Sequence, residues 1–483
     1  MSAAAVSQRQ RRVTVIGAGI TGLAAALRLI QQNKDLYVDV LEESSRAGGV
    51  IQTERRDSFL IEHGPDAFIT NKPGGLQLCS DLGITDQLTG TDEQHRRSLV
   101  VRRGRPVPVP EGFMLMAPAR PSAILKTPIL SFAGKLRLLS EIFRPRKSTD
   151  DDESLASFVR RRFGTETFDR LVQPLVGGIY TSDPERLSLK ATLPRFLEME
   201  RQYGSVIRAV LADKRSGPED SQPSESGARY GLFATHATGL SSIVASIVSA
   251  LESSGRAKVH FNTAVDSVKP THEPTGGWHV RIAGQNQISF QGVILTTPSR
   301  VSAGILQTVD ATLANDLSTI EFASTAIVTT GHRLSDFTHP MDAFGLVVPA
   351  VEDRGILAIS FSSRKFKNRA PNGHVLLRSF LGGAMQADLL DLPDQDILEI
   401  VAAEQQQLLG RSQKARFATV IRYQQAMPQY HIGHSNLVNR IDERVSRQCS
   451  LELAGNSYHG VGIPDCISSG YAAADRLSAD LSD

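Results

Sequence analysis

The pattern of apolar residues predicts a strand, a helix and a second strand at the start of the chain. Residues 12–17 (RVTVIG) form a continuous apolar run, which is typical of a buried parallel strand. The next segment, TGLAAALRLIQQ, is apolar at helical spacing, and YVDVLEE has the composition of a further buried strand. A strand, a helix and a strand in this order form the unit from which doubly wound cofactor-binding sheets are built.

The pattern then changes twice along the chain. Between residues 85 and 215 apolar residues recur at three- and four-residue intervals, as in SLASFVRRRFGTETFDRLVQPLV, which predicts a helical insertion. Segment 213–229 has almost no apolar content and predicts a surface loop at a domain junction. Strand-like runs follow it, and those within 320–385 predict a second, largely antiparallel sheet.

The turn after the first strand carries the spacing of a dinucleotide-binding site. In GAGITG, one glycine allows the tight turn, one lets the backbone approach a pyrophosphate, and one lets the helix pack closely on the strand. The amides and the positive dipole end of the helix then face the phosphates. Glu42 ends the second strand about twenty residues later, where a carboxylate accepts hydrogen bonds from ribose hydroxyls.

The segment SSRAGGVIQT distinguishes FAD from NAD, because it returns a cation and bare backbone to the pyrophosphate. The chain also ends in a strand, a glycine-rich turn and an amphipathic helix, which would complete the same domain. We therefore expect bound FAD. Glu43 is either a further cofactor contact or a solvated charge at the end of a strand. The predicted contacts in these segments are Gly17, Ala18, Gly19, Ile20, Thr21, Gly22, Glu42, Glu43, Arg46, Gly48 and Gly49.

Together these patterns predict an α/β fold with a Rossmann-like FAD-binding domain of the glutathione-reductase type. A substrate domain with a mixed sheet and an inserted helical region complete the expected architecture. The predicted FAD-binding domain comprises residues 11–84, 225–300 and 446–483. The helical insertion spans 85–215, and the antiparallel-sheet substrate domain spans 301–445.

Composition narrows the possible partners and compartments. Lys and Arg total 53 against 51 for Asp and Glu, so the net charge of +2 gives no reason to expect a nucleic-acid partner. The three cysteines lack CxxC spacing, which fits a reducing cytoplasm and predicts no metal site. Arg11 and Arg12 before an apolar run imitate a secretion signal, but the glycine spacing argues against one. Residues 112–132 mix apolar and basic residues, and either core packing or contact with a membrane surface fits them.

Longer motifs resemble the protoporphyrinogen oxidase family within the amine oxidase and phytoene desaturase flavoprotein superfamily. GAGITGLAAA, VLEESSRAGG, EHGPDAF and LAGNSYHGVGIPDCISSG carry the superfamily likeness. The likeness to the family itself lies in QPLVGGIYTSDPERLSLKATLPRFLEME, FGLVVPAVED and VLLRSFLGG. It extends from Val13 to about Leu477.

The resemblance implies further site residues. Those beside the flavin ring would be Gly64, Pro65, Asp66 and Ala67, with Val265 at the adenine end and Asn456, Val461, Gly462 and Ile463 at the start of the last helix. Arg97 would pair with a substrate propionate, although its neighbour Arg96 leaves the register open. Gly178 and Gly345 would leave room for the macrocycle, and its pyrrole rings would contact Phe344, Val347 and Phe380.

By the same resemblance, the protein oxidises a porphyrinogen to a porphyrin in haem biosynthesis, with dioxygen reoxidising the flavin. Protoporphyrinogen IX is the first expectation. Coproporphyrinogen III is the alternative, since GVGIPDC and the SLASFVRRRFG region resemble soluble bacterial enzymes of that type. The flavin carries the chemistry, so no protein group is named as catalytic.

Two rivals are an amine oxidase or carotenoid desaturase of the superfamily, and a binding protein that has lost the flavin. GGIYTSDPERLS argues against the first rival, and the intact GAGITG argues against the second. A chelatase that takes the product is a further expected partner, for a protein that is a monomer or a homodimer. Its expected location is the cytoplasm, with peripheral contact at the inner membrane surface left open.

Overall fold

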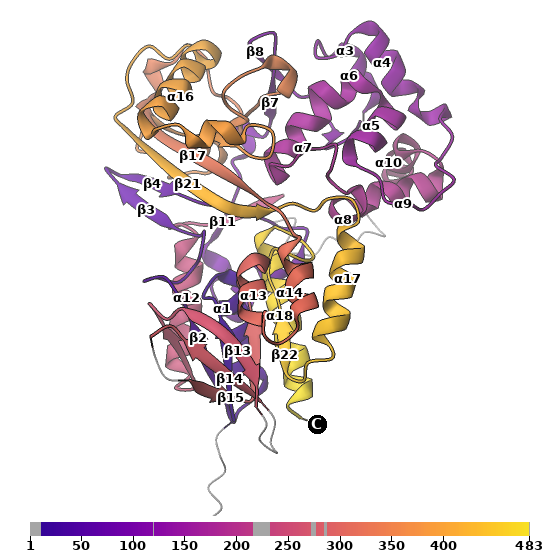
Figure 1. The fold of residues 1–483 in the computed structure, drawn as a ribbon. Helices are drawn as coiled ribbons and strands as arrows, with labels where there is room; N and C mark the ends of the chain where they lie inside the picture. Colours follow the sequence, from indigo (N-terminus) through magenta and orange to yellow (C-terminus); the bar gives the residue numbers. More distant parts are fainter. Residues whose placement is uncertain (1–10, 119, 216–231, 272–276, 285–286, 483) are drawn as a thin grey trace, which may run out of the picture.

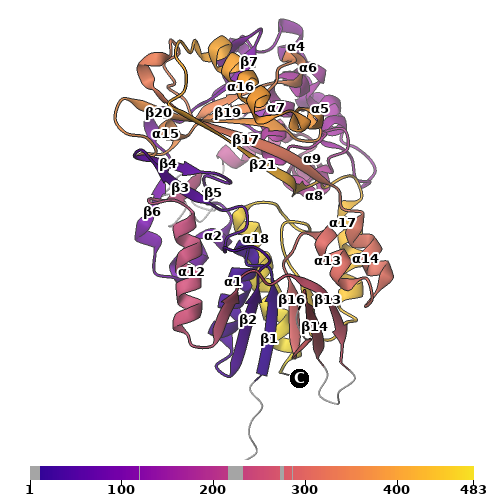
Figure 2. The same cartoon turned by 60° about the vertical axis from the view of Figure 1, so that its left-hand side comes forward.

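The computed structural model describes residues 11–118, 120–215, 232–271, 277–284 and 287–482. The chain forms two lobes, with a nucleotide-binding domain below and a second sheet beside a group of helices above (Figures 1 and 2). The predicted surface loop at 213–229 lies almost wholly outside the described residues. The α/β class and the mixed architecture predicted from the sequence are confirmed.

The lower lobe contains a five-stranded sheet in which every neighbouring pair is parallel. Strand β1 lies at its centre because the run VTVI is apolar on both faces, as a strand covered on both sides requires. The strands, in order across the sheet, are β12 (Ala257–His260), β2 (Leu36–Leu41), β1 (Arg11–Ile16), β16 (Gly292–Leu295) and β22 (Leu451–Leu453).

Helices cover one face of this sheet, and a small antiparallel sheet lies on the other side (Figure 2). The first and last helices approach so closely that a Cβ added at Gly470 would lie 2.4 Å from the carbonyl oxygen of Thr21. The covering helices are α1 (Ile20–Gln32), α2 (Pro73–Asp81), α12 (Ser241–Ser253) and α18 (Ile463–Asp480), and the small sheet consists of β13 (Val265–Pro270), β14 (Trp278–Ile282) and β15 (Ile288–Phe290).

The upper lobe is built on a seven-stranded sheet. The last two strands at one side of this sheet come from the segment predicted to be helical, so that prediction is wrong for residues 98–108. Strand β7 also pairs with β18 in parallel, whereas the rest of the ladder is antiparallel. In order, the strands are β21 (Phe417–Pro428), β17 (Phe322–Arg333), β20 (His374–Gly382), β19 (Ala358–Phe361), β18 (Gly345–Val347), β7 (Ser98–Arg102) and β8 (Arg105–Pro108).

The two faces of the seven-stranded sheet have different neighbours. Leu346 and Leu377 pack with Ile397 and Val401 of α16 (Asp394–Leu409), which closes the outer face. The inner face turns toward the nucleotide-binding domain and the helices beside it (Figure 1). Residues that alternate with those of the outer face, such as Val347, therefore lie on the inner face.

Apart from the short strands β6 (Leu88–Gly90), β9 (Phe113–Met114) and β10 (Ala117–Pro118), the remaining part of the predicted insertion is mainly helical and has an apolar core of its own. A fully buried ion pair between Arg162 and Glu141 stabilises it, and Glu141 also accepts hydrogen bonds from the amides of Val206 and Ile207. The helices used below are α3 (Pro121–Lys126), α4 (Phe132–Leu139), α5 (Leu155–Phe163), α7 (Gln173–Tyr180), α9 (Pro194–Tyr203) and α10 (Val206–Arg215).

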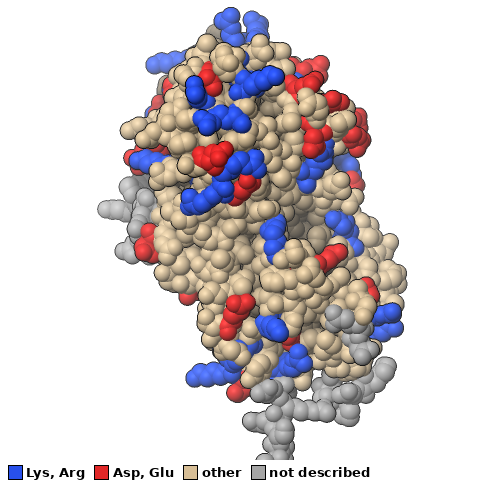
Figure 3. Space-filling view, turned by 90° about the vertical axis from the view of Figure 1, so that its left-hand side faces the viewer, with Lys and Arg blue, Asp and Glu red and all other residues tan. Residues whose placement is uncertain are grey.

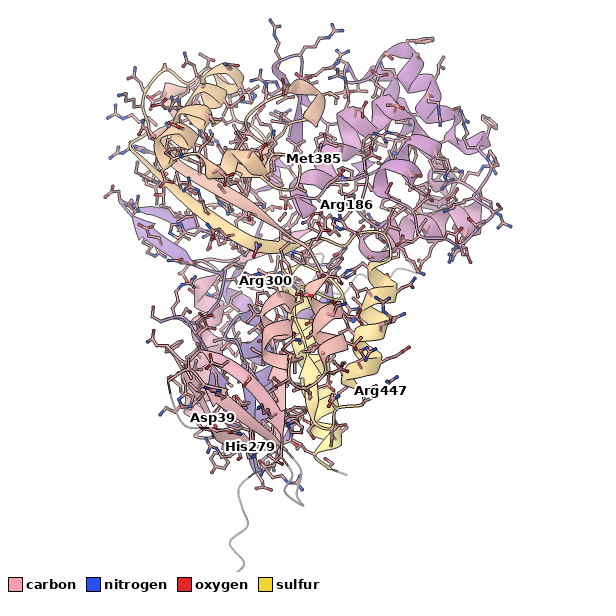
Figure 4. All side chains as sticks on the ribbon, in the orientation of Figure 1. Asp39, Arg186, His279, Arg300, Met385 and Arg447 are labelled. Atoms are coloured by element: carbon pink, nitrogen blue, oxygen red, sulfur yellow. The ribbon has the colours of Figure 1, made fainter. Side chains whose placement is uncertain are left out.

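Helices α13 (Ser299–Leu306), α14 (Ala311–Ser318) and α17 (His434–Val445) pack on the nucleotide-binding domain. The sequence analysis instead predicts most of these residues to be part of the substrate domain at 301–445. Amphipathic spacing shows that a helix has an apolar face, but it does not show which sheet that face covers. Arg300 at the start of α13 lies at the top of the lower lobe, whereas His279 lies at its far end (Figure 4).

Candidate functional site

The turn between β1 and α1 has the geometry of a phosphate-binding loop. Gly17 has a φ of +105°, and a Cβ added at Gly22 would lie 2.0 Å from the carbonyl oxygen of Gly17, so neither position tolerates a side chain. A Cβ at Gly19 would instead meet nothing within 4 Å. Because no side chain caps the start of α1, its first amides are left for a ligand at this open position.

Thr296 holds this turn, and the sequence analysis did not identify it. Its hydroxyl donates to the carbonyl oxygens of Ile16 at 2.9 Å and Gly17 at 3.0 Å. The residue follows β16, which pairs directly with β1. Its place after the apolar run GVIL is the one signal in the sequence that would have pointed to it.

Glu42 lies at the end of β2, as predicted, and its carboxylate is already oriented. One oxygen accepts from the amide of Ala18 at 2.7 Å, and the other accepts from the amide of Ser44 at 2.9 Å. The amide of Thr263 donates to the carbonyl oxygen of Glu42 at 2.8 Å, which brings the start of β13 and Val265 to this end of the site. Glu43 is exposed.

The second glycine segment lies against the first. The amide of Gly48 donates to the carbonyl oxygen of Ala18 at 2.8 Å, and a parallel bridge joins Gly48 to Gly19. The guanidinium of Arg46 donates to the carbonyl oxygens of Gly49 at 2.5 Å and Ile51 at 3.1 Å. Arg46 therefore braces its own turn, which is a structural role beside the predicted cofactor contact.

Residues 64–67 form the turn between β4 (Phe59–Glu62) and β5 (Phe68–Ile69). A Cβ at Gly64 would lie 2.0 Å from the carbonyl oxygen of Val50, so this turn touches the glycine segment just described. The Asp66 carboxylate lies 3.0 Å from Lys365 Nζ and 3.5 Å from an Arg378 nitrogen. Burial raises the pKa of Asp66, but these cations outweigh burial and hold that pKa at about 2.

Asp66 is consequently an anion throughout the neutral pH range and cannot serve as a proton donor. Lys365 and Arg378 were both missed by the sequence analysis. They follow Asp66 by about three hundred residues, and nothing near either residue in the sequence marks it as its partner.

The last predicted cofactor residues lie in the loop between β22 and α18. Asn456 and Val461 belong to this loop, and Gly462 immediately precedes Ile463, the first residue of α18. The amide of Gly462 donates to the carboxylate of Asp465 at 3.3 Å. The loop therefore meets the N-terminal end of a long helix, at the edge of the sheet where β1 and α1 form the first turn.

Two of the predicted substrate residues lie on the inner face of the upper sheet, and a third lies on the helix opposite. Val347 pairs with Ala358, and Ala358 pairs with Phe380 on the next strand, so all three side chains share one face. A Cβ at Gly178 on α7 would lie 3.9 Å from a methyl carbon of Val347 and meet nothing closer. The position of Gly178 thus offers open space opposite Val347.

Gly345 and Phe344 differ from this group. A Cβ at Gly345 would lie 2.3 Å from the carbonyl oxygen of Ile359, so the neighbouring strand already requires glycine there. Phe344 precedes β18, and its carbonyl oxygen accepts from the amide of Phe361 at 2.8 Å. Strand alternation does not group Phe344 with Val347.

Arg97 directly precedes β7, and its carbonyl oxygen accepts from the amide of Phe344 at 2.9 Å. Its Nε donates to the carbonyl oxygen of Asp342 at 2.8 Å, and its guanidinium forms an ion pair with the Asp342 carboxylate. The Arg97 side chain remains 50% exposed, so a second anion can still reach it. Arg96 is also exposed.

Comparison with known proteins identifies the family. The model of the family described as flavin containing amine oxidoreductase matches residues 20–478. The chain belongs to this family. Coproporphyrinogen III oxidase from Bacillus subtilis is 32% identical over 479 residues, covering 98% of this chain and 99% of that relative. The mitochondrial protoporphyrinogen oxidase of Nicotiana tabacum is 27% identical over 496 residues, covering 98% of this chain and 95% of the relative.

Members of this flavoprotein family also include solved structures with the same fold. A crystal structure from Exiguobacterium sp. 255-15, provisionally named a protoporphyrinogen oxidase, superposes with a TM-score of 0.84 at 26% identity. The superposition covers 98% of this chain and 99% of that one. The likeness therefore includes both lobes described above.

The cofactor of this family member is FAD, and the described residues fit it. The open position at Gly19, the uncapped start of α1 and the oriented Glu42 carboxylate would supply the phosphate and ribose contacts of a dinucleotide. On the face shown in Figure 3, the surface is hollowed between the two lobes, and acidic and basic side chains are interspersed around it. When bound, FAD would supply hydride acceptance.

Replacing Gly19 by Val should abolish retention of FAD while the protein still folds. The added methyl groups meet no protein atom near the Cβ position, but they occupy the space that the phosphates need. Gly304→Val is the matched control, because Gly304 on α13 is also open and lies outside the site. Flavin content by absorbance and unfolding temperature of both purified variants check this. A yellow Gly19→Val protein with wild-type flavin content would contradict the site.

Proposed function

We propose that this protein oxidises a porphyrinogen to a porphyrin in haem biosynthesis, with FAD as hydride acceptor and dioxygen as the final oxidant. Of the two substrates expected from the sequence, coproporphyrinogen III is the one we favour. The observation that carries the proposal is the full-length likeness to curated porphyrinogen oxidases, which extends through both lobes and not only through the cofactor motifs.

The choice of substrate rests on differences in that likeness. The coproporphyrinogen III oxidases of Bacillus subtilis and Staphylococcus aureus are 32% and 31% identical over 98% of this chain. Relatives named protoporphyrinogen oxidase are 25–28% identical. The GVGIPDC motif of the last loop supports the same choice.

The chain's own groups would bind and orient the substrate. Val347 and Phe380 offer apolar contact on the inner sheet face, and Gly178 leaves space on the helix opposite, which suits a flat macrocycle. Arg97 would hold a propionate through a charge-assisted bond and so select which bridge carbon faces the flavin. Excluding water between the lobes is the protein's remaining contribution.

Side-by-side rates test the proposal directly. The purified FAD-loaded protein should convert coproporphyrinogen III to a fluorescent porphyrin faster than protoporphyrinogen IX, at equal concentrations below saturation. An oxygen electrode should record dioxygen consumption in step with porphyrin formation. A protein that carries FAD but oxidises neither porphyrinogen would overturn the proposal, and a higher rate with protoporphyrinogen IX would reverse the substrate preference.

Replacing Arg97 by Ala should lower kcat/KM about tenfold to a hundredfold, because a charge-assisted hydrogen bond is worth about 1.5–3 kcal/mol. Lys at this position should restore only part of the loss, since it lacks the planar fork of the guanidinium. Asp342→Asn should leave Arg97 free of its present ion pair and should raise affinity for a substrate carboxylate. Steady-state kinetics with both porphyrinogens measure these changes.

Arg96→Ala is the internal control for the register. Arg96 contributes a similar local charge, but it is Arg97 whose backbone is hydrogen-bonded beside Phe344. Loss of Arg96 should therefore change kcat/KM little. Equal losses in both variants would indicate general attraction of an anionic substrate. A wild-type rate in Arg97→Ala would remove this residue from the site.

Peripheral contact with a membrane surface is a further part of the proposal. Among the described residues, none of the helices has the length and apolar composition to cross a membrane. The outer helices of the insertion nevertheless expose apolar side chains beside basic ones, Arg144 and Arg146 among them. The exposed apolar side chains and their exposed fractions are Leu125 (58%), Phe132 (77%), Leu136 (53%) and Phe143 (83%).

We expect the double variant Phe132→Ser and Phe143→Ser to lose binding to vesicles of phosphatidylcholine and phosphatidylglycerol, with unchanged rates in detergent-free buffer. Flotation of the purified protein with these vesicles measures the binding. Tyr203→Ser is the control, because Tyr203 is an exposed aromatic residue on α9. Equal flotation of the double variant and the wild type would exclude these side chains as the contact.

Transfer of product to a chelatase and the oligomeric state stay predictions.

A further inference from the structure

A tyrosine outside the predicted site holds the loop between β22 and α18, residues 454–462. Tyr430 follows β21 and is 1% exposed. Its hydroxyl donates to the carbonyl oxygen of Asn456 at 2.6 Å and accepts from the amide of Gly460 at 2.8 Å. A single hydroxyl therefore joins the two ends of the loop.

A histidine holds the middle of the same loop. The ring of His434, at the start of α17, stacks on that of Tyr430 with centroids 3.9 Å apart and planes 12° from parallel. Burial lowers the pKa of His434 to about 4, so the ring is neutral near pH 7. Its Nε2 lies 2.9 Å from the carbonyl oxygen of Tyr458, to which the neutral ring donates when its proton is on that nitrogen.

The backbone around Tyr430 is bonded to the helical insertion. The amide of Ser188 donates to the carbonyl oxygen of Tyr430 at 2.8 Å, and the amide of Gly433 donates to the Asp152 carboxylate at 3.0 Å. Asp152 also accepts from the Ser188 hydroxyl at 2.7 Å. The Tyr430 side chain itself belongs to the apolar core of the insertion. Tyr430 is thus shared between the insertion and the last loop of the nucleotide-binding domain.

We propose that Tyr430 is a positioning residue that fixes the flavin-lining loop relative to the helices that cover the substrate. The inference rests on the proposed function for where the flavin and the porphyrinogen lie. The loop needs such a support because Gly455 and Gly460, with φ of +134° and +151°, give its backbone more freedom than other residues would. Without the hydroxyl, the loop retains its sequence but loses its fixed distance from the insertion.

Tyr430→Phe tests this directly, because it keeps the ring and its stacking but removes both bonds of the hydroxyl. The dissociation constant for FAD should rise about tenfold to a hundredfold, the scale expected for two buried main-chain groups left without a partner. The absorption spectrum of bound flavin should shift, and hydrogen exchange should quicken in 454–463 but not in α1. In turnover, kcat should fall more than KM rises.

Tyr471→Phe is the matched control. Tyr471 lies on α18 and donates to the Asp81 carboxylate at 3.1 Å, so the variant loses a hydroxyl bond that does not involve the loop. It should keep wild-type FAD affinity, flavin spectrum and hydrogen exchange in 454–463. His434→Leu is the second test variant, since it removes the bond to Tyr458 and the stacking on Tyr430 but leaves both bonds of the Tyr430 hydroxyl, and it should weaken FAD binding less than Tyr430→Phe.

Wild-type FAD affinity and hydrogen exchange in Tyr430→Phe would overturn the inference. A lower unfolding temperature with an unchanged flavin spectrum and FAD affinity would also overturn it, because Tyr430 would then be an ordinary core residue. FAD affinity and exchange are measured without any porphyrinogen. If the wild type oxidised neither porphyrinogen, the proposed function would be refuted. Weaker FAD binding in Tyr430→Phe would still support the role of Tyr430 in the FAD loop.

Discussion

The contact between the first and the last helix is the constraint on which the rest of the structure depends. Gly470 of α18 lies so close to the backbone of α1 that an added Cβ would be 2.4 Å from the carbonyl oxygen of Thr21. This contact places the glycine turn after β1 and the loop before α18 at one edge of the parallel sheet. The upper sheet and the helical insertion lie over that edge, where the Tyr430 hydroxyl bonds the loop before α18 and the amide of Ser188 in the insertion bonds the carbonyl oxygen of Tyr430.

The sequence predicted the elements whose patterning is local and strong. The apolar run of β1, the helical spacing of α1 and the spacing of Gly17, Gly19 and Gly22 identified the cofactor fold because each follows from backbone requirements within a few residues. Strands β7 and β8 were missed because they are short and lie in a segment whose apolar spacing elsewhere is helical. The parallel partner that stabilises β7 as a strand is β18, about 250 residues later in the chain.

The site residues also fall into two groups: those that local motifs predict and those whose role depends on distant parts of the chain. The structure places Glu42 and the Gly48 segment against the first turn, where local motifs had predicted them. Thr296 was marked only by its place after the apolar run GVIL, and Tyr430 could not be found, because a hydroxyl that bonds distant main-chain groups leaves no spacing pattern in the sequence. Gly345 has an explanation within the fold that needs no ligand. Its glycine was explained by space for a ligand, whereas the carbonyl oxygen of Ile359 on the next strand already excludes a side chain.

The position of α18 has a consequence for how the protein is made. A ribosome releases the chain from its N-terminal end, so the turn at Gly19 and the carboxylate of Glu42 emerge long before Ile463–Asp480. Until that segment leaves the exit tunnel, the half of the binding edge formed by residues 454–463 is missing. Capture of the cofactor is therefore expected late, after the last helix has emerged, and translation that stops short of α18 would leave the parallel sheet without one of its covering helices and the flavin site without its closing half.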